Sequence, residues 1–304
     1  MAKSKSSGSC RRCSGSFARW RLICLYKRLS FMSDICPDLL NAFNCPDTKK
    51  KAELTRALFK GVNDGQYNCI LPCFFPDRPG RPNKPELLAP KHVPRRRIST
   101  GRTGRVALLH AIAHIELNAI DLALDMAGRY AAYGLPFDFV RDWLFVANDE
   151  AKHFMLLSDR LESLDSFYGA LPAHDGLWEA ALATRDDLAG RLAIAPLVLE
   201  ARGLDVTPQL IDKVKLVGDE ASAELLQIIM EDEVGHVATG KRWFDFVCGC
   251  ERRDPISSWQ SLVRQYFKGD LKPPFNIEAR TAAKFSAAFY GPLAAGRPSL
   301  QLLP

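Results

Sequence analysis

Two copies of a Glu-x-x-His motif occur in this chain, and each follows a further glutamate at nearly the same distance. Residues three apart project from one face of an α-helix, so each motif can bring a carboxylate and an imidazole to one point. The first motif begins 34 residues after its glutamate, and the second begins 33 residues after its own. The residues concerned are Glu116, Glu150, His153, Glu200, Glu233 and His236. Such a mixture of carboxylate and imidazole ligands suits iron or manganese.

Helical bundles that hold two iron ions use the same ligand set, in which two helices each contribute a glutamate and two others each contribute a Glu-x-x-His. We therefore expect the six residues to bind two iron ions, with manganese as the alternative. An aspartate directly precedes each motif, at Asp149 and Asp232. A metal-bound imidazole usually donates its other N–H to a carboxylate, so we expect each aspartate to orient the histidine of the opposite motif.

The alternative interpretation is that these glutamates lie on solvated helix faces. Their neighbours at helical spacing argue against it, because Ile112 and Ile120 flank Glu116, and Ile229 and Val237 flank the glutamate of the second motif. The glutamates thus lie on apolar stripes that should face a core. Unpaired buried carboxylates are costly, and metal coordination is the usual solution.

The helices that must position these residues are separated by glycine and proline. They are expected at residues 103–133, 136–161, 188–217 and 219–248. The third is expected to be interrupted between Gly203 and Pro208, and a short helix should lie near Trp178 in the crossover. Turns near Gly134 and Gly218 divide each glutamate pair almost equally, so antiparallel helices place each pair at one height. No segment alternates with period two, and the predicted fold is all-α, a four-helix bundle of the ferritin-like type.

The chain outside the bundle is predicted to fall into four parts. Residues 1–32 form a basic leader rich in Ser and Arg that we expect to be disordered. Residues 33–100 should contain one or two short helices and a proline-rich arm, with seven prolines from position 72 to position 94. Residues 101–294 should form the bundle and a C-terminal extension, and residues 295–304 a tail.

The net charge of +6 comes from the leader, because the first 31 residues hold eight basic residues and no acid. The rest of the chain has 33 basic and 35 acidic residues, so a surface that follows phosphates is not expected. The one local exception is the basic run from Lys91 to Arg105. No run of eighteen apolar residues occurs, and we expect no membrane partner.

Nine cysteines are present, and none lies between Cys73 and Cys248. Because the predicted bundle core lacks cysteine, we expect free thiols and a reducing compartment. Cys10 and Cys13 form a single C-x-x-C without a second pair at zinc spacing, so they are interpreted as incidental thiols.

The other histidines are expected to have supporting roles. His110 and His114 share one face of the first bundle helix, offset from Glu116, and are predicted to belong to the core or to support the metal ligands, with direct ligation as the alternative. His174 should be a loop or capping residue, with substrate contact as the alternative.

Five segments resemble an uncharacterised family found mostly in bacteria, the domain-of-unknown-function family numbered four-five-five. They are Ala107–Leu124, Asp149–Phe154, Leu171–Glu179, Leu199–Pro208 and Asp232–Phe244. The similarity extends from about Ser33 to Ala294, and it implies a ferritin-like fold without indicating a substrate. The family is similar, at a distance, to a bacterial di-iron hydroxylase of a modified tRNA adenosine, which is an analogy of fold alone.

Three functions fit these observations. An O2-dependent oxygenase or oxidase would use the dimetal site, O2, an electron donor and an unknown small substrate. An iron-handling protein, either a ferroxidase or a peroxide scavenger, would use the same ligands without an organic substrate. A tRNA-modifying hydroxylase is the third, although the near-neutral charge of the core opposes nucleic-acid binding. We expect a cytoplasmic protein, or a mitochondrial one if residues 1–31 are a transit peptide in a eukaryote; an oligomer is compatible with the sequence.

Overall fold

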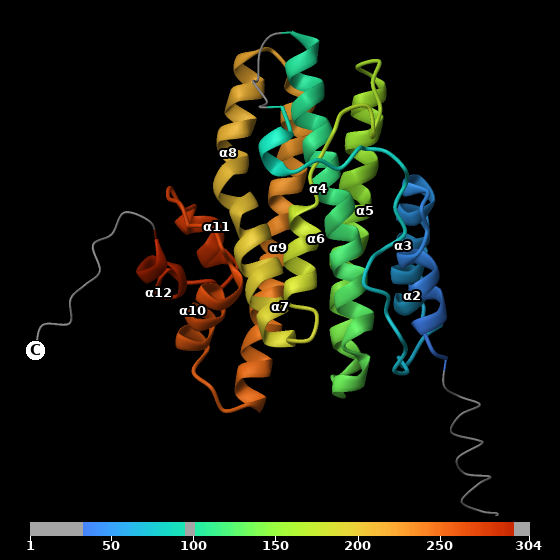
Figure 1. Cartoon of the computed structure of the whole chain (residues 1–304), viewed down its shortest axis with the longest axis vertical. Helices are drawn as coiled ribbons and strands as arrows, with labels where there is room; N and C mark the ends of the chain where they lie inside the picture. The colour runs from blue at the N-terminus through green and yellow to red at the C-terminus, as the bar shows by residue number, and fades with distance from the viewer. Residues whose placement is uncertain (1–32, 95–100, 295–304) are drawn as a thin grey trace, which may run out of the picture.

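The computed structural model describes residues 33–94 and 101–294, and within these ranges the chain is all-α, with isolated β-bridges and no strands. Its centre consists of long helices that lie side by side (Figure 1). Helix α4 packs along α5, and α8 packs along α9. In chain order these central elements are α4 (Arg102–Arg129), α5 (Phe137–Glu162), α7 (Leu188–Ile194), the π-helical turn η3 (Ala195–Glu200), α8 (Ala201–Leu216) and α9 (Glu220–Cys250).

The predicted turns at Gly134 and Gly218 are confirmed. Gly134 has φ 68° before α5, and Gly218 has φ 75° before α9. Both values lie in the left-handed region that glycine adopts without steric cost, so the chain can reverse within a few residues. Asp219 then caps α9 by accepting a hydrogen bond from the backbone N–H of Ser222. The short helix expected near Trp178 is also present, as α6 (Gly176–Ala183).

The predicted interruption between Gly203 and Pro208 is wrong, because α8 runs through both residues. Pro208 cannot donate to the carbonyl of Leu204, one turn earlier. The side-chain amide of Asn276 donates to that carbonyl instead, at 3.1 Å. The helix therefore continues because a distant side chain supplies the hydrogen bond that proline lacks. The irregularity lies earlier, in the π-helical turn η3.

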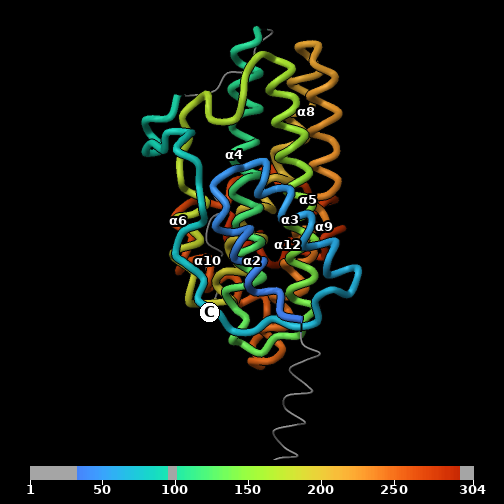
Figure 2. Tube along the Cα trace, turned by 90° about the vertical axis from the view of Figure 1, so that its right-hand side faces the viewer, coloured from blue at the N-terminus to red at the C-terminus, as the bar shows by residue number. Residues whose placement is uncertain are grey.

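Additional helices cover two opposite sides of the long helices (Figure 1). The N-terminal helices α2 and α3 lie beside α4 and α5, and the proline-rich arm continues along the same side (Figure 2). The short C-terminal helices lie beside α7, α8 and α9. The helices of these two layers are α2 (Cys36–Phe43), α3 (Thr48–Asn63), α10 (Pro255–Tyr266), α11 (Ile277–Ala282) and α12 (Ala287–Tyr290).

A disulfide joins Cys36, on α2, to Cys73, in the arm. The expectation of free thiols is therefore wrong for this pair, although Cys45, Cys69, Cys248 and one further late cysteine are free. The pair lies in the N-terminal layer, outside the bundle segment on which the expectation was based. The leader, the C-terminal tail and the Cys10–Cys13 motif lie outside the described residues.

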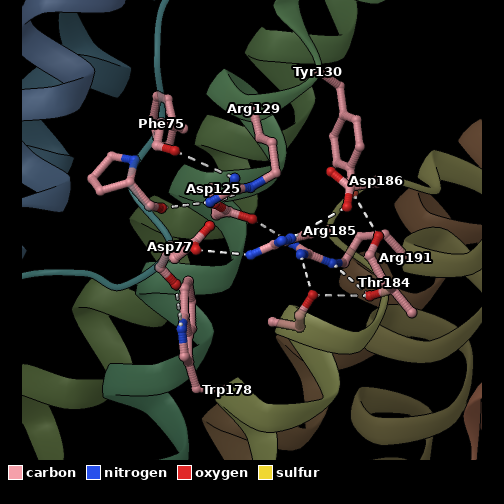
Figure 3. A network of polar contacts seen from close by, with 12 residues as sticks. Phe75, Asp77, Asp125, Arg129, Tyr130, Trp178, Thr184, Arg185, Asp186 and Arg191 are labelled. Atoms are coloured by element: carbon pink, nitrogen blue, oxygen red, sulfur yellow. Dashed lines mark hydrogen bonds and ion pairs between the residues drawn. The ribbon is translucent and has the colours of Figure 1, made fainter.

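Two buried aspartates on α4 attach the arm and α7 to the bundle. Asp121 pairs with Lys51 on α3 and, at 2.7 Å, with Arg81 in the arm. Asp125 pairs with Arg129, at 2.7 Å, and with Arg191 on α7 (Figure 3). A buried carboxylate stabilises a fold when such partners compensate its lost hydration. Each of these acids has two cationic partners from the protein itself.

Helix α4, with the short turn after it to Tyr133, is long and apolar enough to cross a membrane by length and composition. However, 83% of its most apolar window is buried inside the structure. The helix also carries the buried acids Glu116, Asp121 and Asp125. This is the setting of a central core helix.

Asp121→Ala should lower the free energy of unfolding by about 3–5 kcal/mol, because it leaves the buried Lys51 ammonium without its carboxylate partner. The matched control is Asp138→Ala, which removes an exposed pair with Arg141 and should cost less than about 1 kcal/mol. Urea denaturation followed by tryptophan fluorescence measures both losses. Equal, small losses in the two variants would contradict this role of Asp121.

Candidate metal centre

The structure gathers the predicted ligands from four helical elements into the middle of the bundle. Two groups of buried side chains have potential ligand atoms within 4.8 Å of one another. One group contains Glu116 on α4 with Glu150 and His153 on α5. The other contains Glu150 with Glu233 and His236 on α9. Glu150 belongs to both groups, so its carboxylate is shared between them.

The imidazole of His153 is fully buried, and its two nitrogens face different carboxylates. Its Nδ1 lies 3.3 Å from Oε2 of Glu116 and 3.3 Å from Oε2 of Glu150. Its Nε2 lies 2.9 Å from Oδ2 of Asp232, which precedes the other motif. A hydrogen bond from Nε2–H to this carboxylate would leave the Nδ1 lone pair directed at the glutamates.

His236 repeats this arrangement on the other half of the cluster. Its Nδ1 lies 3.1 Å from Oε1 of Glu150 and 3.5 Å from Oε2 of Glu233, while its Nε2 lies 3.5 Å from Asp149. Among the described residues, neither ring nitrogen makes a hydrogen bond of acceptable geometry. The two oxygens of Glu150 therefore face different histidines. Burial opposes charge on His236, but Glu150, Asp149 and Glu233 raise its pKa well above the usual value. A cation bound here would take the place of that proton.

Lys152 is a contributor that the sequence analysis did not identify. Its ammonium group lies 2.5 Å from Asp232 and 3.8 Å from Asp149, so one lysine pairs with both aspartates. The hydrogen bond from His153, with Lys152 as a further partner, lowers the pKa of Asp232 to about 2. Lys152 lies inside the first Glu-x-x-His motif, three residues after Asp149. That spacing was the available signal for a helical ion pair.

Glu200 belongs to neither of these groups, but the charges of Glu233 and Glu150 act on its carboxylate. It lies on the π-helical turn η3, a kind of irregularity that occurs often at functional sites. The turn packs against α9 at Gly240, where a Cβ atom would lie 2.3 Å from the ring of Pro196. On the other side, the indole of Trp259 donates to the carbonyl of Ala193 at 3.2 Å, just before the turn. A glycine and a tryptophan thus allow the irregular turn that carries the fourth carboxylate.

Burial dominates the electrostatics of the cluster. It raises the pKa of Glu116 and Glu200 well above the usual range, and the nearby charges of Glu150 and Glu233 raise them further. Burial opposes charge on His153 as well, but hydrogen bonds to Asp232, Glu116 and Glu150 raise its pKa to about 11. Without metal, protons therefore balance the negative charge. Cation binding at such a site releases them.

The donors of the cluster fit a metal. Three carboxylate oxygens, one each from Glu150, Glu200 and Glu233, are buried without a hydrogen-bond partner among the described residues. Buried polar atoms are rarely left in this state. Divalent cations would satisfy these oxygens and the histidine Nδ1 atoms together, and four carboxylates would neutralise two such ions.

An inner cavity of about 190 Å³ adjoins the cluster. Glu116, Glu200 and Glu233 contribute to its wall. Much of the remaining wall is apolar and includes Ile112, Ala119, Leu122, Leu226 and Ile229. A small molecule in this cavity would contact the carboxylates through an otherwise apolar pocket.

His110 and His114 contact the segment between α5 and α6, residues 163–175. Nε2 of His110 accepts from the backbone N–H of Gly169 at 2.9 Å. His114 lies 2.8 Å from the hydroxyl of Tyr168 and 3.0 Å from the carbonyl of His174. Burial lowers the pKa of His114 to about 4, so it is neutral near pH 7. Their predicted role in supporting the metal ligands stays a prediction.

The fold and the cluster define an all-α protein with buried glutamates and histidines that can hold metal. Residues 44–291 match the family described as "Protein of unknown function (DUF455)", and the chain belongs to this family. It is also similar to an uncharacterized protein of Haemophilus influenzae, with 43% identity over 210 residues that cover 67% of this chain and 73% of the relative. No solved structure shows significant similarity to it.

Asp232→Ala should weaken metal binding about 10–100-fold, because His153 loses the carboxylate that orients its ring. The control is Glu231→Ala, which changes the adjacent, exposed carboxylate on α9. Anaerobic competition for Fe(II) or Mn(II) with a chromophoric chelator gives both affinities. Equal affinities in the two variants would show that Asp232 does not position this ligand.

Proposed function

We propose that this chain is a ferritin-like dimetal carboxylate protein that holds two iron ions and uses O2 to oxidise a small organic substrate. The observation that carries the proposal is the convergence of three buried glutamates, the half-buried Glu200 and two buried histidines, with Glu150 between the two groups. The fold class and the family membership are compatible with the ferritin-like assignment, which rests on this ligand set and on the pairing of the long helices.

Paired iron ions would supply electrons for the reduction of O2, which is chemistry that protein side chains do not provide. Hydroxylation of a C–H bond inserts one oxygen atom and reduces the other to water, so two electrons and two protons must come from a donor. The protein's part is to bind and orient. Glu116, Glu150, Glu200, Glu233, His153 and His236 would hold the metals.

The side chains around these ligands have separate tasks in this proposal. Asp149 and Asp232 would orient the two imidazoles, and Lys152 would hold both aspartates. The apolar wall of the inner cavity would exclude bulk water from the reacting C–H group, which favours reaction of the bound substrate over side reactions.

The partners implied are O2, an electron donor and the substrate, in the cytoplasm; manganese is the alternative metal, and self-association is compatible with the proposal. Iron storage or peroxide scavenging would use the same ligands, but the cavity beside the cluster favours an organic substrate. For tRNA, the basic run gives little support. Arg102 and Arg105 pair with Asp165 and Asp219, and Arg95, Arg96 and Arg97 lie outside the described residues.

Protein purified without oxygen and supplied with Fe(II) should bind about two iron ions per chain, as expected for this ligand set. Exposure to O2 should then change its optical spectrum. Glu150→Ala should lower the number of iron ions bound per chain and abolish the spectral change, because this carboxylate contacts both halves of the site. Elemental analysis and anaerobic stopped-flow absorbance provide the measurements.

The control is Glu224→Ala, an exposed acid on the same helix as Glu233, which should bind iron like the unmodified chain. Failure of the unmodified protein to bind iron or manganese would end the proposal. Iron mineral formed in a soluble assembly, without consumption of an organic compound from cell extract, would favour iron handling.

A further inference from the structure

A second, larger cavity of about 440 Å³ lies beside the inner one. We call it the outer cavity. Its walls come from α4, the crossover around His174 and Leu177, the η3–α8 segment and the C-terminal segment from Phe267 to Arg280. The charged residues of this cavity include Arg202 and Lys272, and they have no role in the metal site or in the proposed oxidation.

The two cavities meet at four side chains. Ile115, Leu177, Leu199 and Arg202 line both of them. Three of these residues are apolar, and Ile115 is 47% exposed although it is adjacent in sequence to the buried Glu116. A ligand that passes this partition would extend from the outer cavity to the carboxylates of the inner cavity. Among the described residues, Arg202 is the one charged side chain that lines both cavities.

The acid closest to Arg202 is already neutralised. Asp205 is buried and accepts from Nε of Arg280 at 2.9 Å and from Nη2 of Arg280 at 2.7 Å. It also accepts from the backbone N–H of Asn276 at 2.9 Å. Such a bidentate ion pair between arginine and a carboxylate is a strong interaction. Asp205 therefore contributes little net negative charge to the outer cavity.

Arg202 and Lys272 remain as cations at the mouth. Arg202 donates through Nη1 to the carbonyl of Lys272 at 2.8 Å and, more weakly, to Oδ2 of Asp205 at 3.5 Å. Its side chain is 43% exposed. The lysine side chain is exposed. Asp270 is the only other acid in the lining of this cavity. Phe267 and Phe275 supply apolar surface beside these charges.

We propose that the outer cavity binds the anionic group of a small amphipathic molecule, a carboxylate or a phosphate, through Arg202 and Lys272. Its apolar part passes Ile115, Leu177 and Leu199 and ends in the inner cavity. This ligand class would be the substrate class of the proposed oxidation. The oxidation of the bound molecule rests on the proposed function, but its binding does not. Binding itself requires no metal.

Octanoate, octyl phosphate and octan-1-ol, at pH 7.5, are the probes, and isothermal titration calorimetry of the full chain, with and without Mn(II), is the measurement. At least one anion should bind several-fold more tightly than the neutral alcohol, and the tighter anion identifies the headgroup. Arg202→Ala should weaken its binding about 10-fold, as expected for loss of a charge-assisted hydrogen bond. Lys272→Ala, at an exposed side chain, should weaken it several-fold without affecting folding.

The matched control is Arg264→Ala, an exposed arginine on α10 outside the cavity lining, which should leave the affinity unchanged. Equal affinities for octanol and both anions, or unchanged anion binding in the Arg202 and Lys272 variants, would overturn the proposal. The apolar path is tested by comparing butanoate with the longer octanoate, which should bind more tightly to the unmodified chain. Ile115→Trp should block the path and remove this difference in affinity. A difference that persists would contradict this path.

The two proposals fail separately. Protein that binds two metal ions but not the anionic probes would refute the ligand site and leave the dimetal function standing. Protein that binds the probes but no transition metal would refute the dimetal function and leave the ligand site standing.

Discussion

The buried Glu116, Glu150 and Glu233 lie close to the half-buried Glu200 inside the bundle. Carboxylates in such a setting require positive charge close by, and this requirement organises the structure. Helix α4 shows two ways of meeting it. Asp121 and Asp125 are neutralised by lysine and arginine side chains from α3, the arm and α7. Glu116 faces Glu150 and His153, and no lysine or arginine pairs with it among the described residues. The acids of this helix are thus divided by their partners into a structural pair, Asp121 and Asp125, and one metal-binding candidate, Glu116.

The C-terminal extension contributes to the same centre from outside. Trp259 and Asn276 donate to carbonyls on either side of the π-helical turn, and Arg280 neutralises the charge of Asp205. A helix with such irregularities would leave backbone groups unsatisfied if it stood alone. The same C-terminal segment forms part of the outer cavity. The position of Glu200 and the shape of the proposed ligand site therefore depend on one set of long-range contacts.

The errors of the sequence analysis have physical causes. Pro208 ordinarily marks a helix boundary, but the amide of Asn276, far along the chain, supplies the missing donor. The cysteine pair was missed because Cys36 and Cys73 belong to separate segments whose approach depends on how the arm folds back. Lys152 was overlooked because its importance comes from two aspartates on different helices. In each case the deciding partner is remote in sequence.

The sequence by itself determined the long paired helices and the expected levels of the ligands on them, but not the course of the third helix or the C-terminal helices. Helical periodicity, the turns at Gly134 and Gly218 and the constant rise of an α-helix place Glu116 opposite Glu150 and Glu200 opposite Glu233, since these relations are local or follow from counting residues. Only the tertiary structure decided how the two halves face each other. Which oxygen of Glu150 meets which histidine depends on the packing of α5 against α9, and the cavities depend on side chains from at least four segments. Such features arise from contacts between segments that no local pattern encodes.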